Sequence, residues 1–210
     1  MPKSVEQPRE TRGARGRPAA TSADEIERAA FRLFEVHGFE ATTLTMISDE
    51  LGLSRRTITR YFPSKNDIPW GHFDSTLPHF SEILSSTSPD QPLWSRIHEG
   101  VVRFNDFPDG ADPSHRTRMG LIYRTPSLQA HSALRNQRWR SVVEVFVAEH
   151  LGADAAGGPL PRVVGHVSMA LATAAYEQWL ESGASTHTEL VEVMNRSMTA
   201  LRQYVGEGAR

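Results

Sequence analysis

The sequence predicts an all-α protein, and three observations lead to that fold class. Apolar residues recur at helical spacing along most of the chain, no stretch alternates convincingly between apolar and polar residues, and glycine or proline separates the periodic segments. The 210 residues are 39% hydrophobic and 23% charged, which fits a globular protein of one large domain or two small ones. We expect about nine helices in three parts: a flexible arm over 1–20, a helix-turn-helix domain over 21–67 and a helical bundle over 68–210.

The arm is rich in proline, glycine and arginine and has few apolar side chains, which predicts a flexible basic segment. Arg15-Gly16-Arg17-Pro18 has the form of a clip that carries two arginines into an A·T-rich minor groove. Loose attraction to phosphates, or no role, is the alternative for so short a match. Residues 1–65 hold eleven basic and nine acidic side chains and the rest is net acidic, which suggests an anionic partner at this end or simply a solvated tail.

Each helix is predicted from a capping residue before an apolar periodic stretch and a glycine or proline after it. Ser22 with Glu25 is a capping box that opens the first helix, and Ser64 with Asp67 opens the fourth. The expected helices cover 22–37, 43–51, 54–62, a segment from 64 past 73 that Pro69 and Pro78 bend or interrupt, 93–104, 116–124, 127–151, 161–182 and 187–205.

The segment 43–62 has the outline of a helix-turn-helix, in which the second helix lies in the DNA major groove. Three arginines and Thr59 fall on one face of this second helix, whereas Ile58 and Tyr61 point to the opposite side. Arginine can contact guanine through two hydrogen bonds, and helix N-termini can hold phosphates. An ordinary helical hairpin with a solvated basic face is the alternative. The residues expected to contact DNA are Thr42, Thr43, Ser54, Arg55, Arg56, Thr57, Thr59, Arg60, Tyr61 and Lys65, with Arg15 and Arg17 of the arm.

Residues 22–70 resemble the DNA-binding domain of the tetracycline-repressor (TetR) family of bacterial transcription regulators. The most specific part of the resemblance is Tyr61-Phe62-Pro63-Ser64-Lys65, directly after the second helix of the helix-turn-helix. More narrowly, Arg55-Arg56-Thr57 and the stretch 60–71 resemble regulators that accompany mycofactocin gene clusters. Arg56 and Thr59 replace residues that are frequent in the family, so the operator sequence cannot be borrowed from another member.

The resemblance implies a TetR-like fold and a cytoplasmic homodimer that binds an inverted-repeat operator in double-stranded DNA. It further implies a ligand-responsive repressor that a small hydrophobic or acyl-CoA-like effector releases from DNA. Activation stays open, because the position of the operator decides between the two effects. A constitutive DNA-binding protein without a ligand pocket is the alternative.

Two long segments near the C-terminus are expected to form the dimer. Segments 161–182 and 187–205 each carry an apolar stripe, and small residues in the first allow close helix contact. Two such helices from each subunit would make a four-helix seam with two-fold symmetry. The alternative is that both helices cover their own core. The expected interface residues are Val167, Leu171, Ala174, Leu190, Met194, Met198 and Leu201.

Large apolar and aromatic residues between these regions are candidate walls of a ligand pocket, although core packing is the commoner role of such residues. The candidates are Phe104, Met119, Tyr123, Trp139, Phe146 and Tyr176. In the family, groups of arginines beside an apolar cavity can bind the phosphates of an acyl-CoA, whereas a solvated basic helix face is the alternative. Two such groups occur, Arg116, Arg118 and Arg124, and Arg135, Arg138 and Arg140.

No enzymatic activity, cofactor or metal is expected. Cysteine is absent, which removes thiol nucleophiles, disulfides and thiolate metal sites. The nine histidines form no metal-ligand pattern, and neither a glycine-rich phosphate loop nor a nucleophile-elbow motif occurs. A carboxylate site assembled from Glu144, Glu149 and Glu177 is the enzymatic alternative. No apolar run is long enough to span a membrane and the start lacks the apolar core of a signal peptide, which agrees with a cytoplasmic protein.

Overall fold

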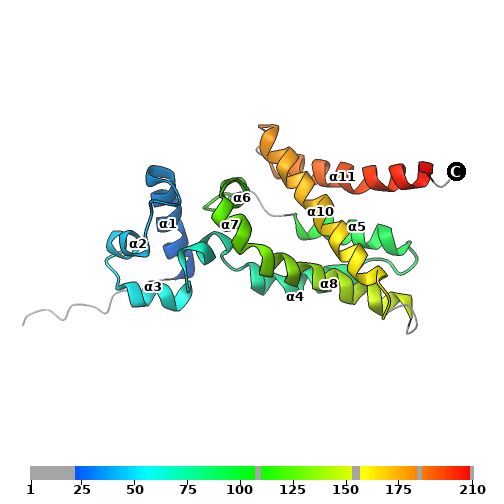
Figure 1. Ribbon diagram of the computed structural model, residues 1–210, viewed down its shortest axis with the longest axis horizontal. Coiled ribbons are helices and arrows are strands. Elements are labelled where there is room, and N and C mark those ends of the chain that lie inside the picture. The colour runs from blue at the N-terminus through cyan, green and yellow to red at the C-terminus, as the bar shows by residue number, and fades with distance from the viewer. Residues whose placement is uncertain (1–21, 107–109, 153–156, 184–185, 209–210) are drawn as a thin grey trace, which may run out of the picture.

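The computed structural model describes residues 22–106, 110–152, 157–183 and 186–208, and it confirms the predicted all-helical fold (Figure 1). No strand occurs within these ranges, and the predicted arm lies outside them. The elements are α1 (Ala23–His37), α2 (Leu44–Glu50), α3 (Arg55–Tyr61), the 3-10 helix η1 (Lys65–Trp70), α4 (Phe73–Ser85), α5 (Leu93–Phe104), α6 (His115–Arg124), α7 (Pro126–His131), α8 (Ala133–Leu151), α10 (Leu160–Glu181) and α11 (His187–Gly208).

The first three helices begin at the caps that the sequence predicts. Ser22 Oγ accepts the amide of Glu25 at 3.2 Å, and the Glu25 carboxylate accepts the amide of Ser22 at 3.1 Å, which completes the capping box of α1. The hydroxyls of Thr43 and Ser54 cap α2 and α3 in the same way. Gly52, with a φ of +64°, makes the turn between α2 and α3, so the helix-turn-helix outline is present.

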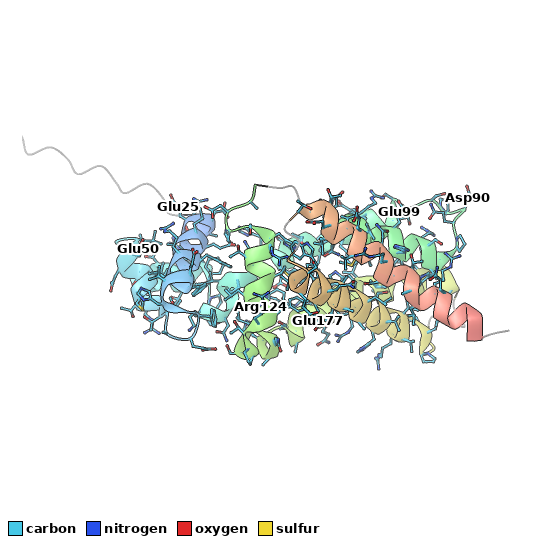
Figure 2. All side chains as sticks on the ribbon, turned by 90° about the horizontal axis from the view of Figure 1, so that it is seen from above. Glu25, Glu50, Asp90, Glu99, Arg124 and Glu177 are labelled. Atoms are coloured by element: carbon cyan, nitrogen blue, oxygen red, sulfur yellow. The ribbon has the colours of Figure 1, made fainter. Side chains whose placement is uncertain are left out.

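Two hydrophobic cores divide the molecule. The first joins α1, α2, α3 and η1, and its isoleucines at positions 26, 47, 58 and 68 are fully buried. The second joins α4, α5, α8, α10 and α11. Leu128 of α7 packs into the first core, although α7 lies directly before α8 of the second core in the chain. In Figure 2, Glu25 and Glu50 mark the end that holds the first core, and Asp90 and Glu99 lie toward the opposite end.

Two predicted helices are each divided in the structure. The fourth becomes η1 and α4, with Pro69 inside η1 and Gly71 at a φ of +48° between the two, whereas α4 continues through Pro78. The predicted single helix over 127–151 is wrong, because it breaks at Ser132 into α7 and α8. The Ser132 hydroxyl donates to Leu128 O at 2.7 Å, a back-bond that bends helices. The bend lets α7 pack on one core and α8 on the other.

No helix in the described part of the chain is both long and apolar enough to cross a membrane.

Candidate DNA-binding surface and ligand cavity

Helix α3 turns its arginines outward and its isoleucine inward. Arg55, Arg56 and Arg60 are exposed, while Ile58 is fully buried in the first core and anchors the helix. Within the described ranges the guanidinium groups of Arg55 and Arg56 have no partner, and Arg60 lies over the ring of Tyr61 with 5.1 Å from Cζ to the centroid. This face is therefore available to base edges and phosphates.

The hydroxyl residues around α3 serve first as caps. Thr43 Oγ1 accepts the amide of Met46 at 3.2 Å, and the Ser54 and Thr57 hydroxyls lie 2.8 Å apart at the start of α3. Thr59 is half-buried and donates to Arg56 O at 3.2 Å. These contacts orient the N-termini of α2 and α3, whose free amides can meet phosphates.

Thr42 is buried, and Lys65 is half-buried with its ammonium held by carbonyls of the same domain. Thr42 is 1% exposed and donates to Gly38 O at 2.8 Å and to Leu33 O at 3.2 Å. The Lys65 ammonium donates to Phe39 O at 2.6 Å and to Glu40 O, and it lies 4.3 Å from the Phe39 ring centroid. Burial lowers the pKa of Lys65, against the opposing effect of the Glu40 charge. Both residues fasten the turn between α1 and α2. Arg15 and Arg17 lie outside the described residues.

A cavity of about 700 Å³ lies where the bundle meets the first core. Five of the six residues proposed as pocket walls line it: Phe104, Met119, Tyr123, Trp139 and Tyr176. Phe146 does not, since it is buried in the second core beneath Arg96, whose Cζ is 4.9 Å from the ring centroid. Ligand pockets of this size hold molecules of drug or metabolite dimensions.

Neutral hydrogen-bonding groups form the polar part of the cavity wall. Tyr176 donates to Asn105 Oδ1 at 2.7 Å, and His115 Nε2 lies 2.8 Å from the same phenol oxygen, which places the His115 proton on Nε2. Burial, together with the nearby His187, lowers the pKa of His115 to about 4. Burial raises the pKa of Tyr123 to about 12 and that of Tyr176 well above its usual value. At neutral pH these three side chains therefore carry no charge.

One end of the cavity is formed by the first helix of the DNA-binding part. Glu27 of α1 is 4% exposed and forms an ion pair with Arg118 of α6, and both line the cavity. Arg118 also donates to Pro69 O at 2.8 Å and lies over the ring of Phe31. Burial lowers the pKa of Arg118 to about 10, so the guanidinium stays charged at neutral pH. A cavity ligand would thus touch the same ion pair that ties α1 to α6.

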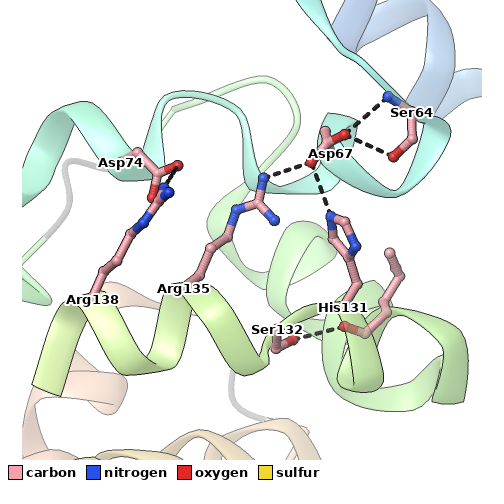
Figure 3. Close-up of polar contacts among 8 residues, drawn as sticks. Ser64, Asp67, Asp74, His131, Ser132, Arg135 and Arg138 are labelled. Carbon is pink, nitrogen blue, oxygen red and sulfur yellow. Dashed lines mark hydrogen bonds and ion pairs between the residues drawn. The ribbon is translucent and has the colours of Figure 1, made fainter.

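A second ion pair joins η1 to α8, and Figure 3 shows it. Asp67 accepts Arg135 at 2.8 Å and His131 at 2.9 Å on one oxygen, and the amide and hydroxyl of Ser64 on the other. Burial alone would raise the pKa of Asp67, but the hydrogen bonds from Arg135, Ser64 and His131 outweigh it and lower the pKa to about 2. Asp67 was expected only to cap a helix. It also fixes the junction between the two cores.

Five of the six arginines proposed for coenzyme A phosphates hold other parts of the chain. Arg116 and Arg124 donate to carbonyls in the last turn of α10, Arg118 and Arg135 pair with Glu27 and Asp67, and Arg138 pairs with Asp74 (Figure 3). Arg140 Nε is buried without a hydrogen-bond partner among the described residues. Of these six, Arg118 alone lines the cavity.

The residues proposed for the dimer interface divide between core and surface. Leu190, Met194 and Met198 of α11 are fully buried in the protomer's own core, which leaves them no surface for a partner. Val167, Leu171 and Leu201 are half-buried and Ala174 is exposed. For Leu190, Met194 and Met198 the alternative holds, since the apolar stripe of α11 covers the protomer's own core.

The sequence around Glu27 carries a sign of its buried contact. Glu27 lies on the same face of α1 as Ala30 and Phe31, which are buried at the i+3 and i+4 positions. A carboxylate on the apolar face of a helix needs a partner when the face is buried. The identity of that partner, 91 residues away, has no local signal.

Comparison with known proteins defines the family. Residues 26–68 match the family model of the bacterial regulatory proteins of the tetR family, and residues 91–205 match that of the MftR C-terminal domain. The chain belongs to the TetR family. This TetR regulator therefore binds DNA through its helix-turn-helix and is a transcriptional regulator rather than an enzyme.

Relatives of this TetR regulator cover most of its length. A Mycobacterium tuberculosis protein named as a mycofactocin biosynthesis transcriptional regulator, MftR, is 34% identical over 174 residues, which are 83% of this chain and 87% of the relative. The transcriptional regulator TcmR of Streptomyces glaucescens is 26% identical over 173 residues, 80% of this chain and 76% of the relative.

Solved structures show that the fold is shared. The fatty acid degradation regulator FadR of Bacillus halodurans aligns with a TM-score of 0.56 at 17% identity, over 86% of this chain and 96% of that one. A complex of SmeT with triclosan aligns with a TM-score of 0.54 at 19% identity, over 88% and 90%.

Proposed function

We propose that this TetR regulator is a homodimeric repressor that binds an inverted-repeat operator and leaves it when a small hydrophobic or acyl-CoA-like effector occupies the cavity. Residues 21–67 would read the DNA, and residues 68–210 would hold the effector and form the dimer. The observation that carries the proposal is the cavity itself, because its wall includes α1 of the DNA-binding part.

Recognition would depend on the exposed face of α3. In a dimer the two α3 helices would lie about one DNA turn apart, roughly 34–36 Å, in successive major grooves. A ligand that binds better to a dimer with another spacing must lower operator affinity by the same factor, a coupling of roughly 1–3 kcal/mol.

The character of the cavity supports an effector with a largely apolar body. Aromatic and methionine side chains supply much of the apolar wall, and the tyrosines and His115 are uncharged at neutral pH. The solved complex of SmeT with triclosan and the fatty-acid name of FadR concern proteins of the same fold and are compatible with such a ligand. The engaged arginines of α8 do not favour coenzyme A phosphates on that helix.

The dimer contact is proposed on the outer face of α10. Val163, Val167, Ala170 and Ala174 recur at helical spacing there, and Val163 is 51% exposed. An apolar stripe that solvent reaches in the protomer is the usual mark of an interface.

Ala174→Glu tests this contact, because a charge at the centre of the seam would separate the subunits. Light scattering should show a monomer and operator binding should be lost, whereas Ser81→Glu on the exposed side of α4 should leave a dimer. A dimer that tolerates Ala174→Glu would place the interface elsewhere.

Release of ligand by the native protein tests the whole proposal. Mass spectrometry of the protein purified from its own cells should reveal a small molecule, and adding that molecule should release a bound operator duplex. The alternative, a constitutive DNA-binding protein, is disfavoured by the open cavity. It would be supported if a protected inverted repeat stayed bound at every ligand concentration.

A further inference from the structure

We propose that the effector carries an anionic head group on its apolar body, and that this group replaces the Glu27 carboxylate as the partner of Arg118. This inference rests on the proposed function, since it names the chemistry of the effector and the contact through which its binding reaches α1. In this proposal the Glu27–Arg118 ion pair breaks when the effector binds, and the effector takes the place of Glu27.

The charges around the cavity single out this pair. Of the acids that line the cavity in the described part of the chain, Glu27 alone is buried, while Asp24, Asp112 and Glu177 are exposed. Arg118 is the partner of Glu27, and its side chain is 22% exposed. Asp24 Oδ1 lies 3.3 Å from His72 Nε2, and the charge of Asp24 also acts on Arg118. Arg28 also lines the cavity and is half-buried, like Arg118. An anion that enters the cavity therefore meets two cations, and at Arg118, which a buried carboxylate already holds, it would compete with Glu27.

A second donor on the same wall lacks an acceptor. Trp70 lines the cavity and is 8% exposed, and its indole Nε1 is buried with no hydrogen-bond partner among the described residues. Trp70 follows Pro69, whose carbonyl accepts from Arg118, so both donors belong to the same part of the wall. Buried donors without acceptors are rare and costly. Because Nε1 itself is covered in this structure, a head group bound to Arg118 would reach this second donor only once the wall shifts.

Displacement of Glu27 would move the DNA-binding helices. A buried carboxylate that loses its partner is strongly unfavourable, so it must reach water or a new partner. The backbone of Gly71 closes one direction, because a Cβ there would lie 2.9 Å from Glu27 Oε2 and 3.1 Å from Arg118 Nη1. A shift of α1, the helix that carries Glu27, would give the displaced carboxylate a new position. Since Ile26 and Ala30 of α1 are fully buried in the core that also holds Ile58 of α3, α3 must follow.

The test compares an acid with its neutral ester in variants of the full-length protein. Calorimetric titration with dodecanoate and with methyl dodecanoate gives an acid-to-ester affinity ratio. Glu27→Gln frees Arg118, so it should raise the affinity for the acid by about tenfold and leave that for the ester within about twofold. Glu25→Gln is the matched control, since it removes the same charge two residues away and glutamine can still complete a capping box. It should leave the ratio unchanged.

Arg118→Gln is the converse variant. It removes the cation while Glu27 stays, so the acid-to-ester ratio should fall below that of the wild-type protein. A general loss of stability would weaken both ligands equally and would not move the ratio. The exchange is overturned if Glu27→Gln strengthens acid and ester alike, or neither. Dodecanoyl-coenzyme A forms a third arm, and a gain confined to it would assign the head group to phosphate rather than carboxylate.

The outcome separates this inference from the proposed function. If acid and ester release the operator equally and Glu27→Gln leaves their ratio unchanged, ligand response stands and the exchange is wrong. If the ratio follows Glu27 but neither ligand ever affects operator binding, the anion site stands and the proposed ligand response is wrong.

Discussion

At the scale of single residues, some charged side chains are exposed to solvent and others form contacts within the protein. Arg55 and Arg56 are exposed on α3 without a partner in the described ranges, whereas Lys65 is held by two carbonyls and an aromatic ring. The sequence alone treats all three as basic groups near DNA. Their contacts predict different consequences when each is removed.

Arg56→Ala should change recognition without changing folding. Its exposed guanidinium forms no hydrogen bond or ion pair within the described residues, so thermal unfolding should stay as in the wild type, while discrimination at one operator base pair should fall by about 1–3 kcal/mol. Fluorescence anisotropy on a set of single-base operator variants measures this.

Lys65→Ala is the contrasting variant. It removes the hydrogen bonds to Phe39 O and Glu40 O, which should cost about 1.5–3 kcal/mol of stability and lower affinity for all DNA sequences alike. The two assignments would be reversed if Lys65→Ala kept the wild-type melting temperature and Arg56→Ala lowered it.

His115 should make stability depend on mildly acidic pH. Its pKa of about 4 lies below the usual 6.5, so the unfolded chain takes up a proton before the folded one does. Stability from neutral His115 is complete above about pH 6.5 and is lost as pH falls toward 4, about 2 kcal/mol between pH 7.5 and pH 5. Denaturant unfolding measures it at each pH.

His115→Gln is the control, because its amide can still donate to Tyr176 but does not titrate. The variant should not show the loss of stability at low pH that protonation of His115 causes in the wild type. If wild type and variant lose stability in parallel over this range, the group responsible is another histidine.

At the scale of elements, local signals predicted where helices start better than where they break. Ser22, Thr43 and Ser54 were identified as caps because the chemistry of a cap lies within four residues. The break at Ser132 was missed, because a serine inside a periodic stretch reads as a solvent-facing residue. The helix breaks at Ser132 because Leu128 before it and α8 after it are buried in different cores.

Substitution at the junction between η1 and α8 should lower the free energy of unfolding. Asp67→Asn removes the charge that accepts from Arg135, His131 and Ser64, and leaves Arg135 half-buried without its ion pair, at a cost of about 2–3 kcal/mol. Thermal and denaturant unfolding measure it.

Asp74→Asn is the matched control, since Asp74 pairs with Arg138 only at the surface, with 44% and 49% of the two side chains exposed. An exposed pair contributes at most about 1 kcal/mol. Equal losses in the two variants would show that Asp67 does not fix the junction.

At the scale of the whole molecule, two cores meet across a cavity, and ion pairs from distant parts of the sequence join them. Five of the six pocket walls were predictable, because large aromatic residues at helical spacing point inward whether they fill a core or line a cavity. The pairing of Glu27 with Arg118 was not, since only the folded chain brings α1 and α6 together. The proposed ligand response depends on that arrangement, which places the cavity against the DNA-binding part.

The central claim is that the exposed face of α3 reads base sequence, and a competition between two duplexes tests it most directly. Anisotropy is measured for the regulator with its operator and with a scrambled duplex of the same length, over a range of salt. The account predicts that the operator is bound at least about 10³-fold more tightly at physiological salt. Equal affinity for the two duplexes, lost together as salt rises, would contradict it.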